Sequence, residues 1–351
     1  MKKVAIIGKF DTVNGISDGQ AVKTNILAQE IEQACGAENV IRISTYGWKK
    51  APLRLFGQSI LAVWRSENVI FMTDEGGIRV FPWLLRLANI AGRCKLHYAV
   101  VGGWLLHFPE KHKILSACLK GFDGIYVETT AMKRGLERHG FQNLQLMPNC
   151  KRLRLLQKED LEMRTAEPHM LCTFSRVMRE KGIADAVGAV REVNERYGRA
   201  VYTLDIYGQI DPDQKQWFED LSNSFPSEIR YCGIAEYDRS VEVLKDYYAL
   251  LFPTGFYTEG VPGTIIDAYA AGVPVISSKW ESFSDVVEDG RTGIGYDFSK
   301  PEMLRQILME LAASPERMSA MKECCLEKAQ AFLPENTLGV LLDALGIPAK
   351  V

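Results

Sequence analysis

Short apolar runs alternate with amphipathic stretches along the whole chain. Apolar runs of strand length are typical of strands that are buried on both faces of a parallel sheet. Such runs occupy residues 3–8, 40–44, 68–73, 96–101, 123–127, 144–147, 170–176, 201–207, 228–232 and 248–252. Between the runs, apolar residues recur at helical spacing, as at Ile183, Ala186, Val187 and Val190 ahead of Gly198. The pattern therefore predicts a parallel α/β protein.

The chain is long enough to form more than one such unit. With 351 residues it can hold two domains with separate cores. We predict a Rossmann-like domain over residues 1–150, a linker over residues 151–167 and a second domain over residues 168–334. Within the second domain, two helices are expected to fill residues 301–331.

The composition indicates an ordinary soluble protein. Hydrophobic residues make up 47% of the chain and charged residues 25%. The eight cysteines show no C-x-x-C spacing, which favours reduced thiols in a cytosolic protein. The first apolar run ends at Gly8, too early for a secretory signal, and no run reaches the length that spans a bilayer. We therefore expect a cytoplasmic protein.

The charge is divided unevenly between the two halves. Residues 1–150 hold 19 Lys and Arg against 12 Asp and Glu, a net charge of +7, whereas residues 151–351 carry −9. A basic half joined to an acidic half suggests that one side meets an anionic surface or ligand. Nucleic acid is not expected as this partner, because no recognised binding module is present and the cations do not interleave with stacking aromatics.

The most informative segment follows the apolar run 248–252. It leads into a loop that holds Glu259, and Pro262 lies just ahead of a helix expected to begin near Thr264. Exposed amides at the start of this helix would form an anion site at the positive end of its dipole. These amides belong to Gly263, Thr264 and Ile265, with Gly260 in the preceding turn. The arrangement resembles a site for a sugar joined to a diphosphate; the alternative is an ordinary turn between a strand and a helix.

Two cations follow the run 170–176 in a comparable position. Arg176 ends this run and Lys181 stands ahead of the next helix. Fixed cations stabilise the negative charge of a departing diphosphate without rearranging. The alternative is that both residues are surface cations on a loop.

Together, these segments resemble the retaining GT-B glycosyltransferases, in particular the GT4-like family called glycosyl transferases group 1. In this chain Glu259 and Gly260 begin the family signature, and residues 271–276 close it. Asp267 stands where the family has a second Glu, eight residues after the first. The resemblance is strong over residues 170–300.

The resemblance implies an α/β fold of the GT-B type, with two Rossmann-like domains facing each other across a cleft. The last segment, residues 335–351, would pack back onto the first domain. The implied reaction is the retaining transfer of a sugar from a UDP- or GDP-sugar to a glycan or lipid-linked glycan, as in polysaccharide or glycoconjugate biosynthesis. No metal or other cofactor is expected. Asp211 and Asp213 have the spacing of a metal-binding D-x-D motif, but they lie in a turn where a helix-capping role suits them better.

The resemblance also assigns roles to residues. Arg176 and Lys181 would grip the diphosphate, Glu259 the transferred sugar and Asp267 the ribose; Arg176, Lys181 and Glu259 are the catalytic candidates. Further donor contacts are expected from loop residues after other strands, which are Gly19, Gly208, Gly233 and Ile234. The acceptor would meet residues of the first domain, which are Asp18, Gly102, Gly103, Trp104 and His107. Many family members carry a His where this chain has Gly102, and His107 is the candidate substitute.

One further segment has the composition of a membrane contact. Trp48, Lys49, Lys50 and Arg54 precede an apolar stretch, a combination suited to the anionic inner face of a membrane. The alternative is a core-facing helix with a solvated basic start.

Other functional classes share parts of this pattern. A sugar-nucleotide 2-epimerase has GT-B architecture but would need acid and base residues that do not form a convincing cluster here. A non-catalytic glycan-binding protein could keep the fold, although Arg176, Lys181 and Glu259 favour an enzyme. A dehydrogenase is not expected, because Gly8 is not followed by the rest of a G-x-G-x-x-G motif.

Overall fold

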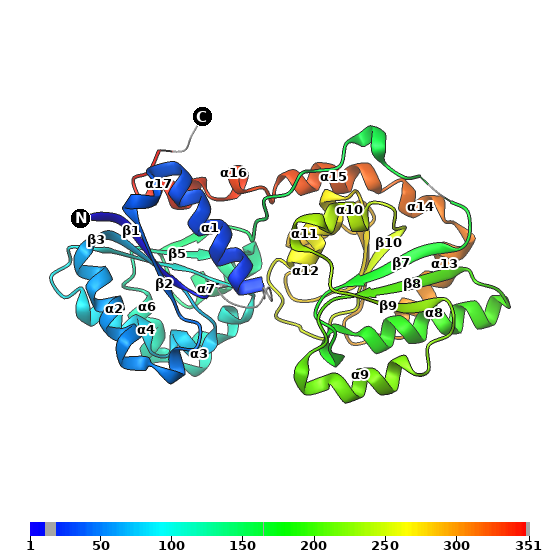
Figure 1. Ribbon diagram of the computed structural model, residues 1–351, viewed down its shortest axis with the longest axis horizontal. Helices are drawn as coiled ribbons and strands as arrows, with labels where there is room; N and C mark the ends of the chain where they lie inside the picture. Colours follow the sequence, from blue (N-terminus) through cyan, green and yellow to red (C-terminus); the bar gives the residue numbers. More distant parts are fainter. Residues whose placement is uncertain (11–18, 164, 349–351) are drawn as a thin grey trace. The chain divides into compact units, whose positions relative to one another are not determined.

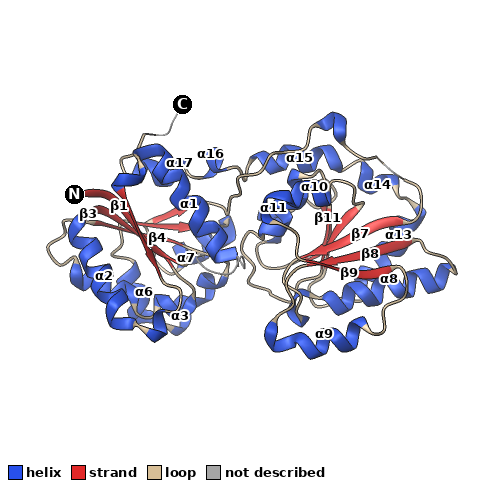
Figure 2. Ribbon diagram, viewed as in Figure 1, coloured by secondary structure: helices blue, strands red, loops and turns tan. Residues whose placement is uncertain are grey.

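The computed structural model describes residues 1–10, 19–163 and 165–348, and the chain forms two compact units (Figure 1). Unit 1 comprises Met1–Arg152 together with Phe332–Val351, and unit 2 comprises Leu153–Ala331. Each unit is a parallel sheet between helices, as Figure 2 shows. The predicted parallel α/β pattern is thereby confirmed.

The sheet of unit 1 has the strand order β2-β1-β3-β4-β5-β6. Its strands are β1 (Lys2–Gly8), β2 (Val40–Ser44), β3 (Ser66–Met72), β4 (Lys95–Ala99), β5 (Gly124–Val127) and β6 (Leu144–Leu146). Its helices are α1 (Gly19–Cys35), α2 (Pro52–Arg65), α3 (Glu75–Ile78), α4 (Phe81–Ala88), α5 (Phe108–Lys111), α6 (Lys113–Leu119), α7 (Thr130–Arg138), α16 (Pro334–Thr337) and α17 (Gly339–Ala344).

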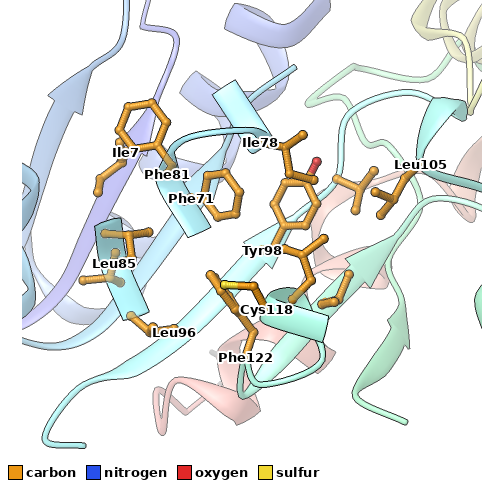
Figure 3. Close-up of a cluster of buried hydrophobic side chains, with 14 of the residues drawn as sticks. Ile7, Phe71, Ile78, Phe81, Leu85, Leu96, Tyr98, Leu105, Cys118 and Phe122 are labelled. Atoms are coloured by element: carbon orange, nitrogen blue, oxygen red, sulfur yellow. The ribbon is translucent and has the colours of Figure 1, made fainter. Parts of the chain in front are cut away.

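Both faces of the unit 1 sheet are buried, because successive side chains of a strand point to opposite sides. Ala5 and Ile7 of β1 belong to a core under α2, α4, α6 and α7, part of which Figure 3 shows around Phe71, Phe81 and Tyr98. The neighbouring side chains of β1 lie on the opposite face, in a core formed with α1 and α17. The amide of Asn68 also donates to the carbonyl of Leu345 at 3.3 Å.

The sheet of unit 2 has the order β12-β11-β10-β7-β8-β9. Its strands are β7 (His169–Phe174), β8 (Tyr202–Tyr207), β9 (Ile229–Gly233), β10 (Ala249–Phe252), β11 (Val275–Ser278) and β12 (Gly293–Tyr296). Its helices are α8 (Ile183–Tyr197), α9 (Lys215–Ser222), α10 (Ser240–Leu244), α11 (Gly263–Ala270), α12 (Phe283–Val286), α13 (Met303–Ala313), α14 (Glu316–Ser319) and α15 (Lys322–Gln330). α8 and α13 share one buried core with the sheet.

Two details differ from the sequence-based expectation. Within the described stretch 165–348, residues 301–331 form three helices rather than two, because Pro315 interrupts the helical pattern and begins a short separate turn. The strands β11 and β12 were not expected. Each is short and β12 contains two glycines, so neither shows the pattern of a longer apolar run.

The side chain of Lys322 is buried next to Tyr247, which lies just ahead of β10. Its Nζ donates to the carbonyl of Tyr247 at 2.9 Å, and burial lowers its pKa to about 8. The folded protein therefore loses this proton at a lower pH than the unfolded chain, so the contribution of Lys322 to the free energy of unfolding, measured as wild type minus Lys322→Met, should rise between about pH 8 and pH 10.5.

We expect this rise to reach about 3 kcal/mol. Urea unfolding at a series of pH values measures it. Lys300→Met, which removes an exposed ammonium of the same unit, should retain the rise. Parallel pH profiles for wild type and Lys322→Met would show that the buried ammonium does not titrate in this range.

Candidate functional site

The carboxyl ends of β7 and β10 form the point at which the strand order of unit 2 reverses. β7 pairs with β8 on one side and with β10 on the other. In open parallel sheets, ligands bind at this kind of switch point, where the loops diverge. The loop after β7 carries Arg176 and Lys181, and the loop after β10 carries Glu259. The topology thus brings the predicted catalytic candidates to one edge of one sheet.

Lys181 and Glu259 form an ion pair at this edge. The Lys181 ammonium donates to Oε1 of Glu259, and the Thr254 hydroxyl donates to the same oxygen at 3.0 Å. The ammonium also lies 5.4 Å from the ring centroid of Phe252 and 5.0 Å from that of Phe256. Both charged side chains are largely buried, so solvent screens the pair weakly. The carboxylate and the two rings hold the cation in one place.

Gly182 allows the two loops to approach this closely. Its φ is 69°, and a Cβ at this position would lie 1.9 Å from the carbonyl oxygen of Pro253. The amide of Gly255 then donates to the carbonyl of Glu180 at 2.7 Å, which ties the loop after β10 to the loop after β7. A larger residue at position 182 would separate Lys181 from Glu259.

Arg176 lies at the same edge and keeps a half-exposed guanidinium. Its Nη1 is 3.6 Å from Oδ2 of Asp211. Asp211 also accepts a hydrogen bond from the amide of Asp213 at 3.0 Å and caps a short turn, as the sequence predicted. The sequence did not reveal the pairing of Asp211 with Arg176, because the two residues meet only when β7 and β8 lie side by side.

The start of α11 supplies hydrogen-bond donors beside Glu259. The amide of Ile265 donates to the carbonyl of Pro262 at 3.0 Å, which corrects the expectation that this amide is available to an anion. The amides of Gly263 and Thr264 belong to the first turn, where an α-helix provides no partner for them. The Thr264 hydroxyl is buried and has no hydrogen-bond partner among the described residues. A bound polar ligand would satisfy such a group.

Asp267 occupies the buried side of α11. Its side chain is only 2% exposed, and Oδ1 accepts a hydrogen bond from the Ser240 hydroxyl of α10 at 2.9 Å. The carboxylate therefore connects two helices. A contact between Asp267 and a ribose stays a prediction.

The carboxyl ends of β8 and β9 complete this edge of the sheet. Gly208 has a φ of 137°, and a Cβ there would lie 1.8 Å from the carbonyl oxygen of Ser175, next to Arg176. The amide of Gly208 donates to the carbonyl of Gly233 at 2.8 Å, and Ile234 beyond it is exposed. The predicted donor residues of these two loops are thus brought to the same edge as Arg176.

An ion pair between the exposed guanidinium of Arg230 and the buried carboxylate of Asp205 connects β8 and β9. Arg230 donates to Oδ1 and Oδ2 of Asp205 at 2.6 and 2.8 Å, and Tyr247 donates to Oδ2 at 2.5 Å. Burial alone would raise the pKa of Asp205, but the hydrogen bonds from Arg230 and Tyr247 outweigh it and hold the pKa below its usual value.

In unit 1, Gly19 begins α1, whereas Asp18 lies outside the described residues. Gly102 follows β4 and has a φ of 80°, a conformation that a His would adopt only with strain, which accounts for the glycine at this position. Gly103 is buried, and the indole of Trp104 donates to the carbonyl of Val101 at 2.9 Å. His107 is half-buried at the end of the turn Trp104–His107.

A buried ion pair that the sequence did not reveal lies directly beside Gly102. Lys23 of α1 donates to Oε1 of Glu128 at 2.6 Å and to the carbonyl of Val100 at 2.7 Å. The amide of Gly102 donates to the same Glu128 oxygen at 3.3 Å. Both charged side chains are only 3% exposed. The pair connects α1, β4 and β5 at the edge where the predicted acceptor residues lie.

The described part of the chain lacks two features, a cluster of metal ligands and a membrane-spanning helix. Residues 1–10, 19–163 and 165–348 contain no group of three or more His, Cys, Asp or Glu side chains placed to hold a metal ion. Among the same residues, no helix has the length and apolar character needed to cross a bilayer.

Comparison with solved structures defines the class of fold. The chain superposes on Anabaena HepE, solved in complex with UDP, with a TM-score of 0.77 and 13% identity over 99% of this chain and 100% of HepE. It superposes on the lipopolysaccharide outer core galactosyltransferase WaaB with a TM-score of 0.71 and 14% identity over 99% of each chain. The fold is therefore the GT-B fold of two Rossmann-like units, as predicted.

Comparison of sequences shows a family match over part of the chain. Residues 168–314 match the family described as glycosyl transferases group 1, which confirms over this range the resemblance seen in the sequence motifs. The amylovoran biosynthesis glycosyltransferase AmsK of Erwinia amylovora is 24% identical over 162 residues, which cover 44% of this chain and 39% of AmsK. The chain thus spans less than half the length of the curated relatives it matches.

Proposed function

We propose that this chain is a retaining, metal-independent glycosyltransferase that moves a sugar from a nucleoside diphosphate sugar to a glycan or lipid-linked glycan. The observation that carries the proposal is the position of Arg176 and Lys181 with Glu259 at the switch point of unit 2. The family match over residues 168–314 supports it.

In this proposal the two cations neutralise the diphosphate as it departs. Arg176 is half exposed and its partner Asp211 is 3.6 Å away, so the guanidinium is accessible to a phosphate. The amides of Gly263 and Thr264, with the Thr264 hydroxyl, bind the other side of the diphosphate. Fixed donors of this kind stabilise charge that develops in the transition state.

Glu259 is the proposed contact to the transferred sugar. Lys181 and Thr254 both donate to its Oε1, so this carboxylate is held in a defined position. Donor and acceptor react on the same face of the sugar, and no protein nucleophile is required. Gly208, Gly233 and Ile234 contact the nucleoside, and Asp267 the ribose.

The donor is proposed to be a UDP- or GDP-sugar. HepE was solved with UDP and with UDP-glucose, and the pneumococcal O-GlcNAc transferase GtfA with UDP and GlcNAc, which supports UDP-sugars as the first candidates. The acceptor is proposed to be assembled on the inner face of the cytoplasmic membrane, as part of polysaccharide or glycoconjugate biosynthesis.

Thermal unfolding with a panel of UDP- and GDP-sugars in EDTA tests the donor. A ligand at a hundred times its Kd stabilises a protein by about 2.7 kcal/mol, which should raise the Tm of unit 2 by roughly 5–10 °C. We expect this rise with sugars of one nucleotide base and none with ADP. A protein that no nucleotide sugar stabilises would be a non-catalytic binding protein, and conversion of the free donor without any acceptor would indicate an epimerase.

A further inference from the structure

Helix α2 of unit 1 exposes an apolar stripe to solvent. Its inner side chains, such as Leu55 and Val63, are buried in the core. On the opposite side, Leu53 is 84% exposed, and Leu61 and Trp64 are also exposed. The spacing of eight and then three residues places these three side chains on one face of the helix.

Helix α4 continues this apolar stripe. Phe81 and Leu85 are buried, whereas Trp83 and Leu87 are exposed one turn apart, and Ile90 just beyond the helix is 85% exposed. The two helices pack side by side (Figure 1), and the indole N–H of Trp64 donates to the carbonyl of Ala88 at 3.1 Å. The exposed side chains form one surface, here called the α2–α4 face, comprising Leu53, Leu61, Trp64, Trp83, Leu87 and Ile90.

The segments that carry the α2–α4 face hold cations and no acidic residues. Residues 45–66 and 76–109 contain no Asp or Glu. Arg54 and Arg65 lie beside the apolar stripe of α2, and both are exposed. Within the described part of the chain, neither of these arginines forms an ion pair. The face therefore combines apolar side chains, two tryptophans and unpaired cations.

These outward side chains differ from those that the sequence suggested. The ring of Trp48 is partly buried and meets Phe81 edge-on, with ring centroids 6.4 Å apart. Trp48 thus packs on the core of unit 1, and Leu53, Leu61 and Trp64 form the exposed surface instead.

We propose that the α2–α4 face docks onto the anionic leaflet of a membrane. Tryptophan favours the boundary between headgroups and acyl chains, and exposed apolar side chains beside cations suit an anionic leaflet. A symmetric dimer through this face would bring arginines of both copies together without acidic partners, which disfavours a second copy as the occupant. The docking does not depend on the proposed transferase activity, but it would bring unit 1 to a lipid-linked acceptor.

Vesicle flotation without any nucleotide sugar tests the docking. The full chain should bind vesicles of phosphatidylcholine with 30% phosphatidylglycerol at low salt, should bind pure phosphatidylcholine at least tenfold less, and should dissociate as salt rises. Leu53→Ser/Leu87→Ser/Ile90→Ser should lower the binding at least tenfold. Arg54→Ser/Arg65→Ser should lower it and reduce its dependence on salt.

Matched variants elsewhere provide the controls. Leu146→Ser/Met163→Ser removes exposed apolar side chains away from the face, and Lys215→Ser/Lys300→Ser removes exposed cations; both should bind as wild type does. An unchanged Tm in each variant shows that it is folded. Equal vesicle binding by wild type and the triple serine variant would overturn the proposal. So would an absence of vesicle binding together with a dimer, detected by light scattering, that the triple variant abolishes.

Discussion

Replacement of Arg176 or of Lys181 by alanine is expected to lower the rate of sugar transfer at least a hundredfold. Each cation lies at the switch point of unit 2, where the departing diphosphate is proposed to bind. Removing one fixed group that stabilises developing charge costs about 3 kcal/mol of transition-state stabilisation. The measurement is the turnover of the donor identified by thermal stabilisation, with calorimetry of the free nucleoside diphosphate as a second readout.

Arg179 provides a matched control on the same loop. Its guanidinium lies over the ring of Trp217, 4.9 Å from the centroid, and not against Glu259 or Asp211. Arg179→Ala should therefore keep turnover within a fewfold of wild type. Arg176→Ala should retain the Tm of the free protein within a few degrees, whereas Lys181→Ala should lower it, because the largely buried Glu259 loses its counter-charge. Wild-type turnover in either variant would contradict the proposed clamp.

Removing only one charge of the Lys23–Glu128 pair is expected to lower the free energy of unfolding of unit 1 by about 3–5 kcal/mol. Lys23→Met would leave the Glu128 carboxylate buried without the 2.6 Å contact to an ammonium. A buried charge that has lost its counter-charge is costly because solvent cannot replace the lost ion pair. Urea unfolding followed by tryptophan fluorescence measures the change, since four of the six tryptophans, at positions 48, 64, 83 and 104, belong to unit 1.

Removing both charges should restore much of this loss. Lys23→Met/Glu128→Leu leaves no unpaired ion, so its free energy of unfolding should exceed that of Lys23→Met alone. The exposed pair Lys3–Glu67 of the same unit is the control, and Lys3→Met should change stability by less than about 1 kcal/mol. If Lys23→Met and Lys3→Met lowered the free energy of unfolding by similar amounts, a buried ion pair would contribute no more to stability than an exposed one.

The local sequence pattern was sufficient to predict most of the strands and helices and to recognise the main motifs. The run from Val4 to Ile7 is apolar at every position because both faces of β1 are buried, so it could be recognised without any partner strand. The start of α11 was found to within one residue from Pro262. Arg176, Lys181 and Glu259 are candidates because their residue types and spacing resemble the motifs of the family.

Contacts between distant residues could not be predicted in this way. Lys181 and Glu259 are 78 positions apart, and Lys23 and Glu128 are 105 positions apart. Neither pair has a periodic signal, because the order of strands in a sheet decides which loops meet. The same applies to Asp267, whose burial depends on the approach of Ser240 from α10.

The sequence by itself determined that this chain is a parallel α/β protein with a glycosyltransferase-like motif after two of its strands, because strand periodicity and loop residue types are local properties. The tertiary structure alone decided which charges pair and which apolar side chains remain exposed. Leu53 and Leu55 are the same residue type two positions apart on α2, yet one is 84% exposed and the other 4%. The difference arises because the sheet covers only one side of the helix, and the position of that sheet follows from the packing of the whole unit.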